Sequence, residues 1–199
     1  VGGILYQGDA FPSSYRDKYI AVDTLGHAVR WHHVEPDRST FRTKNGGVLV
    51  QANDTWFAPS DATMGPDGAV YFADWHDQRT AHPDPDANWD RDNGRVYHLR
   101  WRSAKPAEHV DPQALSNDRL VGWLASENEW RVRRARRVLA ERRDPNIAHR
   151  LRTLLAKADD DHLSLQLVWT LAALGQFDQA TDRVLLEHRS EAIRAWNIR

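Results

Sequence analysis

The sequence predicts a β + α chain in two parts, the C-terminal blades of a β-propeller followed by an α-helical, HEAT-like solenoid. Turn-forming residues are confined almost entirely to the first part, since nine of the 11 glycines and seven of the nine prolines lie at or before Pro106. After that point apolar residues recur every three or four positions, as in amphipathic helices. We therefore expect a partial propeller of about two blades over 1–103, a linker over 104–111 and helical repeats over 112–199.

The first part contains short runs rich in β-branched and aromatic residues, each bounded by turn formers. The expected strands are Gly3–Gln7, Lys18–Asp23, Ala28–Val34, Gly47–Gln51, Asp61–Met64, Ala69–Asp74 and Gly94–Trp101. Short strands at this spacing are typical of a sandwich, a barrel or a propeller.

An internal repeat favours the propeller among these three. Tyr19–Asp23 followed by Gly26–Trp31 resembles Tyr71–Asp74 followed by Gly94–Tyr97, and 51 residues separate Asp23 from Asp74. Each copy is an apolar strand that ends in Asp, a loop, and a Gly-led strand with an aromatic residue. That distance suits a propeller blade with a loop insertion.

The second part predicts helices that pair into repeats of roughly 30–40 residues, as in HEAT solenoids. The expected helices are Leu120–Ser126, Trp130–Arg142, Asn146–Lys157, His162–Leu174, Gln179–His188 and a last one from Glu191. Asp144 before Pro145, and Asp161 before the next apolar run, are the expected N-caps.

Composition excludes several classes of site. The net charge is −1, with 12 Lys/Arg against 16 Asp/Glu up to Asp111 and 15 against 12 beyond it, so neither part predicts nucleic-acid binding. The absence of cysteine excludes disulfides, thiolate metal sites and cysteine nucleophiles. The longest apolar run, near Leu167–Leu174, is too short to span a membrane.

The loop Asp74–Asp92 gathers carboxylates and imidazoles, which suit calcium or, with the histidines, a transition metal. The candidate metal ligands are Asp74, Asp77, His82 and Asp90. The alternative is a solvated loop in which the Asp side chains bond their own turns.

Asp23 and Asp74 end equivalent strands, so an Asp–His pair with His27 is a candidate general base in a propeller funnel. The alternative is that each Asp caps its turn. A polar–aromatic corner at 53–57 suits either stacking on a sugar ring or wedging between blades. The candidate ligand contacts are Asp23, His27, Asn53, Asp54, Trp56, Asp74, His76, Asp77, Arg91 and Arg95.

The helix expected around 130–143 contains seven arginines, which suits anionic lipid or phosphate. Nearby acidic residues instead favour an exposed face of ion pairs.

A set of motifs in the first part resembles a known family. They are Tyr6-Gln7-Gly8-Asp9, Phe11-Pro12, Tyr15-Arg16, Asn53-Asp54-x-Trp56-Phe57, Gly65-Pro66-Asp67-Gly68, Asp74-Trp75-x-Asp77 and Trp89-Asp90-Arg91-x-Asn93-Gly94-Arg95. Together they are similar to the exported "membrane-bound dehydrogenase" proteins of planctomycetes, which carry a glucose/sorbosone dehydrogenase-like propeller and HEAT repeats.

This resemblance implies a periplasmic or extracytoplasmic oxidoreductase acting on sugars or polyols, with its catalytic base on an earlier blade outside this chain. It implies pyrroloquinoline quinone and calcium as cofactors, and haem only in a domain outside this chain. The relatives' cationic clamp for the quinone is absent, because Thr24–His27 and Ala58–Asp61 contain neither Lys nor Arg. The expected partners are a carbohydrate or polyol and a protein bound by the repeats. The alternative is a non-catalytic scaffold that binds glycan or protein.

Overall fold

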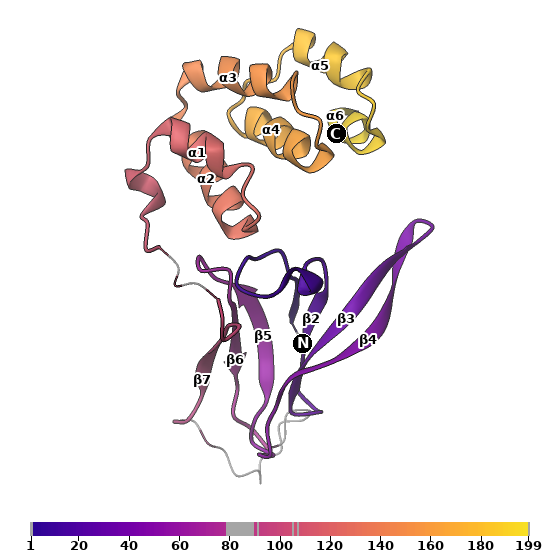
Figure 1. Cartoon of the computed structure of the whole chain (residues 1–199), viewed down its shortest axis with the longest axis vertical. Helices are drawn as coiled ribbons and strands as arrows, with labels where there is room; N and C mark the ends of the chain where they lie inside the picture. The colour runs from indigo at the N-terminus through magenta and orange to yellow at the C-terminus, as the bar shows by residue number, and fades with distance from the viewer. Residues whose placement is uncertain (1, 79–89, 91, 105, 107, 199) are drawn as a thin grey trace. The chain divides into compact units, whose positions relative to one another are not determined.

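A computed structural model describes residues 2–78, 90, 92–104, 106 and 108–198 (Figure 1). These residues form two antiparallel sheets and six α-helices, so the expected mixture of β followed by α is confirmed. The chain divides into two compact units, unit 1 over Val1–Glu108 and unit 2 over His109–Arg199. The division falls within the expected linker.

Sheet A of unit 1 is an antiparallel meander of four strands in the order of the chain. The strands are β1 (Gly3–Leu5), β2 (Tyr19–Asp23), β3 (Ala28–Asp37) and β4 (Thr40–Gln51). β3 was expected to end at Val34 and β4 to begin at Gly47, but β3 continues to Asp37 and β4 begins at Thr40. His32 pairs with Tyr19, the first residue of β2, and beyond this pair β3 and β4 continue as a two-stranded ribbon. Pro36 lies in this ribbon, where no third strand among the described residues needs its missing N–H.

Sheet B is a second meander, formed by β5 (Pro59–Met64), β6 (Val70–Asp74) and β7 (Arg95–Leu99). The turn from β5 to β6 is closed by the Gly68 N–H, which donates to the Gly65 carbonyl at 3.0 Å. Gly68 has a φ of +72°, which explains the need for glycine there. Asp23 pairs with Ala28 and Asp74 with Arg95, so the two copies of the sequence repeat occupy equivalent places in the two sheets.

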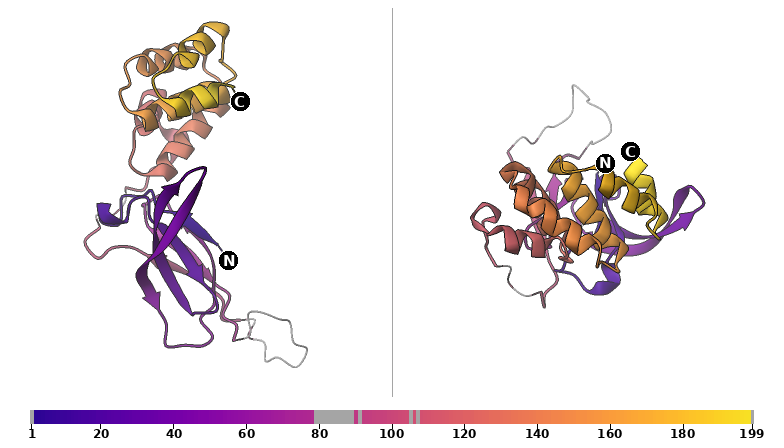
Figure 2. Two further views of the ribbon diagram at one scale, coloured as in Figure 1. Left: turned by 90° about the vertical axis from the view of Figure 1, so that its right-hand side faces the viewer. Right: turned by 90° about the horizontal axis from the view of Figure 1, so that it is seen from above.

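The core of unit 1 contains side chains from both sheets. Figure 2 shows the ribbons of these sheets from two further sides. The largest fully buried side chain of this core is Tyr6, whose hydroxyl donates to the Gly68 carbonyl at 2.8 Å and accepts from the N–H groups of Ala10 and Phe11 at 3.1 and 2.8 Å. Burial raises the pKa of Tyr6. One phenol therefore fixes the N-terminal segment to the first turn of sheet B.

Unit 2 consists of helices that alternate with short turns. They are α1 (Asn117–Trp123), α2 (Glu129–Arg142), α3 (Pro145–Leu155), α4 (Asp161–Ala173), α5 (Gln179–Leu186) and α6 (Glu191–Ile198). α4 is central, since it packs against α2, α3 and α6. The unit has its own apolar core, built mainly from leucines such as Leu139, Leu151 and Leu167.

The helix N-caps confirm one expectation and correct another. The Asp144 carboxylate accepts from the Asn146 N–H at 2.9 Å and caps α3, as expected. Asp161 is not a cap, because it is the first residue of α4, and Asp160 accepts from the His162 and Leu163 N–H groups. Asp159 and Asp160 precede this helix, and Asp160 caps it because it stands directly before the first helical residue.

The arginines of α2 make ion pairs and aromatic contacts. Arg133 lies 3.5 Å from Glu129, and Arg137 lies 2.8 Å from Glu141. Three other guanidinium groups lie over tryptophan rings, with the pairs Arg131–Trp123, Arg134–Trp130 and Arg136–Trp169. No helix in the described part of the chain has the length and apolar character needed to cross a membrane.

Candidate functional site

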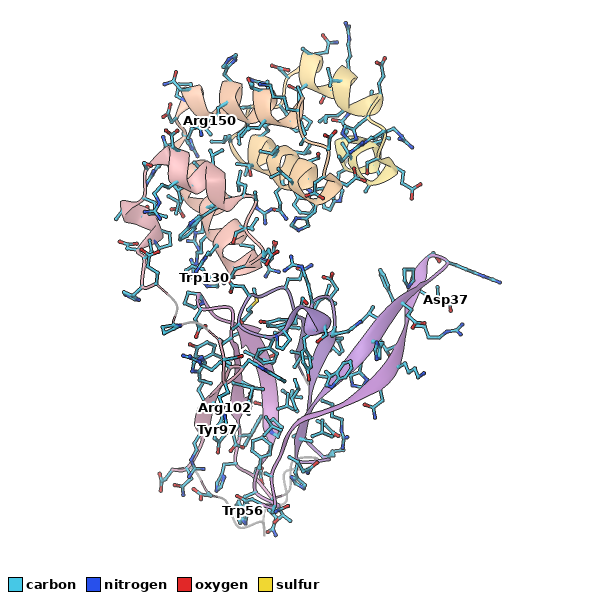
Figure 3. The ribbon with its side chains drawn as sticks, viewed as in Figure 1. Asp37, Trp56, Tyr97, Arg102, Trp130 and Arg150 are labelled. Atoms are coloured by element: carbon cyan, nitrogen blue, oxygen red, sulfur yellow. The ribbon has the colours of Figure 1, made fainter. Side chains whose placement is uncertain are left out.

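Most of the candidate residues lie at one end of unit 1, where β2 and β6 end and β3, β5 and β7 begin. We call this the loop end and define it as residues 23–28, 52–59, 74–78, 90 and 92–95. The Thr24 hydroxyl donates to the Pro59 carbonyl at 2.6 Å, and Pro59 pairs with Asp74, so loops from both sheets meet there. Figure 3 labels Trp56 at this end.

Asp23 holds the turn between β2 and β3. Its carboxylate accepts from the Gly26 N–H at 2.9 Å and from Arg30 Nε at 2.8 Å. The Arg30 hydrogen bond is the main reason why the pKa of Asp23 is lowered. Both oxygens are thus engaged in structural contacts, as the turn-capping alternative predicts.

His27 links the two sheets. It adopts a left-handed backbone with a φ of +52°, and its Nδ1 lies 2.7 Å from the Phe57 carbonyl oxygen. Since a carbonyl only accepts, Nδ1 carries the proton in this contact. The Asp23–His27 pairing expected for a general base is not formed through this nitrogen.

Asp74 organises the loop end of sheet B. It is 4 % exposed, and its Oδ1 accepts from the N–H groups of Ala58 and His76, each at 2.9 Å. The Trp75 N–H in turn donates to the Ala58 carbonyl at 3.0 Å. This carboxylate therefore clamps the segment before β5 to the segment after β6.

His76 lies between two carboxylates and against an aromatic ring. Its Nδ1 is 3.9 Å from Asp74 and its Nε2 is 3.5 Å from Asp90, while its ring stacks on Trp56 with 5.6 Å between centroids. Its side chain is 13 % exposed, and the buried Nδ1 has no hydrogen-bond partner among the residues that the structure describes. The carboxylates of Asp23 and Asp74 accept hydrogen bonds from backbone N–H groups. The His76 ring instead lies against the side chains of Asp74, Asp90 and Trp56.

Asp90 closes the other side of the His76 ring. Its carboxylate accepts from the Asn93 side chain at 2.7 Å and from the N–H groups of Asp92 and Asn93. The hydrogen bond from the Asn93 side chain is the largest cause of its lowered pKa, and His76 adds a smaller contribution. Asp90 is therefore a carboxylate held in its ionised form beside the Trp56–His76 stack.

The other candidates divide between turn contacts and positions outside the described residues. Asp54 accepts from the Trp56 N–H at 2.9 Å and closes the turn that begins at Asn53. Asp77 is buried, and Arg95 donates to the Asn93 carbonyl at 3.0 Å. Arg91 and His82 lie outside the described residues.

The metal site stays a prediction. Among residues 2–78, 90 and 92–104 of unit 1, no three His, Asp or Glu side chains form a group that would hold a metal ion. Asp74 already accepts two backbone N–H groups, and Asp90 is bound by Asn93. The residues that the structure describes do not fit a calcium ion.

Trp75 was missed among the candidate residues. Its side chain is 65 % exposed although it directly follows the buried end of β6. Its position in the motif Asp74-Trp75-x-Asp77 was the available signal, because strand alternation places the residue after a buried Asp on the opposite face. The loop end thus displays one exposed indole and one stacked on His76.

Comparison with protein families gives one match. Residues 1–103 match the family described as "Domain of unknown function (DUF7133)". The chain belongs to this family. The match covers the described strands of unit 1, including the loop end, and stops before unit 2. No curated protein matches the DUF7133 chain. No solved structure matches it either.

Proposed function

We propose that the loop end of unit 1 binds a carbohydrate or polyol within a larger, exported dehydrogenase-like propeller protein. The observation that carries this proposal is the Trp56–His76 stack with the ionised Asp90 at its edge. Aromatic faces beside a few fixed polar groups are the chemistry of small-molecule recognition sites. The exposed Trp75 indole is a second aromatic side chain at the loop end.

The propeller part of the proposal is supported by the two sheets. Both are antiparallel meanders in chain order, and the repeated segments occupy equivalent strands in each. A succession of short helices around one apolar core in unit 2 supports a HEAT-like solenoid. In this arrangement the repeats offer a surface for a protein partner.

The residues present do not fit pyrroloquinoline quinone held in the relatives' manner. Its carboxylates need charge-assisted partners, and neither 24–27 nor 58–61 contains Lys or Arg. Arg30 follows the first of these segments by three residues, but its guanidinium is bound to Asp23. We therefore propose that this chain contributes the recognition of the sugar.

The test is a binding titration of the full chain with a panel of aldoses, polyols and oligosaccharides, followed by tryptophan fluorescence and calorimetry. We expect saturable binding that Trp56→Ala and Trp75→Ala each weaken about tenfold, the equivalent of about 1.4 kcal/mol. The control is Trp196→Ala, which removes an indole that is 41 % exposed from unit 2 and should leave affinity unchanged.

Two results would overturn the proposal: no saturation with any member of the panel by folded protein, or equal weakening by all three variants. Reconstitution of the longer protein with quinone and calcium then separates enzyme from scaffold. Dye reduction with a sugar that binds supports the dehydrogenase, and binding without turnover supports the scaffold.

A further inference from the structure

A row of charged, polar and aromatic side chains lies where α2 and α4 pack together in unit 2 (Figure 1). Its members are linked by contacts and are three or four positions apart on each helix, so they share one face. They are Glu129, Arg133 and Arg136 on α2, and His162, Gln166 and Trp169 on α4. We call them the α2–α4 row. The side chains of Arg133 and His162 are 66 % and 45 % exposed, so solvent reaches the row.

A single carboxylate serves two guanidinium groups in this row. The Glu129 carboxylate is buried, and it lies 3.5 Å from Arg133 Nε and 3.7 Å from His162 Nε2. Its charge also acts on Arg136, but these two side chains do not form an ion pair. With a neutral imidazole at His162, the α2–α4 row therefore carries one net positive charge.

Arg136 is the cation of the row that has no carboxylate partner among the described residues. Its Nη1 donates to Gln166 Oε1 at 2.8 Å, and its guanidinium lies over the Trp169 ring, 5.4 Å from the centroid. Both of these partners are neutral. Burial lowers the pKa of the Arg136 guanidinium, because it removes part of the water around the charge. A partly desolvated cation costs free energy, and a carboxylate that paired with it would offset this cost.

The Trp169 ring connects this guanidinium to a second indole, that of Trp196 on α6. The two rings meet edge-on, with 5.1 Å between centroids and an interplanar angle of 77°. Trp196 is 41 % exposed, so apolar surface lies next to the charged group. Tryptophan and arginine are enriched among the residues that contribute most binding energy at protein interfaces. The face therefore combines an anchor for an anion with an anchor for an apolar side chain.

We infer that this face of unit 2 binds an acidic polypeptide segment of a partner protein, in which a glutamate or aspartate pairs with Arg136 and a neighbouring apolar residue packs on Trp196. The single charge of a carboxylate matches the one net positive charge of the α2–α4 row. A phosphate monoester carries about 1.5–2 negative charges and would exceed it. The inference rests on the part of the proposed function in which the repeats bind a protein, and it does not depend on sugar binding at the loop end.

The test titrates three short peptides with blocked ends into the isotope-labelled full chain and follows the indole N–H signals by NMR. The first peptide has one glutamate next to a phenylalanine among glycines and serines, and the other two replace this glutamate by glutamine or phosphoserine. We expect the glutamate peptide to shift the Trp169 and Trp196 signals to saturation, and the glutamine peptide to bind about tenfold more weakly because the charge-assisted pair is lost. No saturation, equal affinity for the glutamine peptide, or tighter binding of the phosphoserine peptide would overturn the inference.

A pair of matched variants assigns the binding to the α2–α4 row. Arg136→Gln should weaken binding of the glutamate peptide about tenfold, because it removes the positive charge that the carboxylate meets. Arg134→Gln is the control, since Arg134 lies on the same helix and also over a tryptophan ring, that of Trp130, but outside the row. It should leave the affinity unchanged. Circular dichroism shows whether both variants are folded, and equal weakening by the two would contradict the assignment.

Trp196→Ala separates this inference from sugar binding at the loop end. It removes an exposed indole and should weaken the glutamate peptide while the affinity for a sugar stays the same. Trp56→Ala should do the reverse. An unchanged peptide affinity in Trp196→Ala would overturn the inference. Failure of the sugar titration alone would instead count against the loop end and leave the peptide site standing.

Discussion

Asp74 provides the sharpest test of how the loop end is built. Asp74→Ala removes the acceptor of two backbone N–H groups, those of Ala58 and His76, in a place that water scarcely reaches. Asp74→Asn is the matched variant, because its side-chain carbonyl can still accept from both groups while the negative charge is lost.

The expected magnitudes follow from these contacts. A hydrogen bond to a charged group contributes about 1.5–3 kcal/mol, and an unsatisfied buried donor costs about 1–3 kcal/mol. Ala58 is fully buried and the His76 N–H partly so, which predicts a loss of about 3–5 kcal/mol for Asp74→Ala. Asp74→Asn should lose about 1 kcal/mol, the charge-assisted part alone.

Scanning calorimetry of the full chain measures both variants, with unit 2 as the internal reference because the chain has two compact units. For a unit of this size each kcal/mol lowers the midpoint by about 4–8 °C, so Asp74→Ala should lower the unit 1 transition by at least about 12 °C. The unit 2 transition should not move. A drop below about 4 °C, or equal drops for both variants, would refute the clamp role of Asp74.

Three further variants test other parts of the structure. Gly68→Ala should cost about 2 kcal/mol or more in thermal unfolding because the φ is +72°. Gly94→Ala should be nearly neutral, because among the described residues the nearest atom to an added Cβ is the Asp74 carbonyl oxygen at 3.5 Å. Since Arg30 lowers the pKa of Asp23, their contact stabilises the fold above about pH 4 and is lost as the pH falls through the depressed pKa. Below pH 4 the urea concentration at half unfolding should therefore change less with pH in Arg30→Met than in the unchanged protein. The same pH dependence in both proteins would contradict this. Asp160→Ala should cost unit 2 about 1 kcal/mol through the lost cap, and Asp160→Asn should cost little, as measured by circular dichroism.

The sequence predicted the regular elements well because local signals determine them. β2, for example, was expected over Lys18–Asp23 and is found over Tyr19–Asp23. Its alternating apolar residues and bounding turns leave little choice of register. The extension of β3 and β4 was missed because residues 35–46 are largely polar, and the ribbon they form is held by its ladder and not by burial.

The sequence placed the candidate residues at strand ends, where the structure also has most of them, but the role of each residue was not determined by sequence. Asp23 and Asp74 end equivalent strands, and only the structure shows that one binds Arg30 while the other binds Ala58 and His76. The stack of Trp56 on His76 joins residues 20 positions apart on different segments, which no local pattern specifies. Such pairings depend on how the β5 and β6 ends meet.

The bond from the Tyr6 hydroxyl to Gly68 has a consequence for biosynthesis. These residues are 62 positions apart, so the N-terminal segment cannot complete its contacts until the Pro66 turn has been made. At the usual rate of about 5–20 residues per second, the ribosome needs roughly 3–12 s for that stretch. During this interval sheet A emerges without its phenol anchor, and the nascent chain exposes apolar surface that the finished unit conceals.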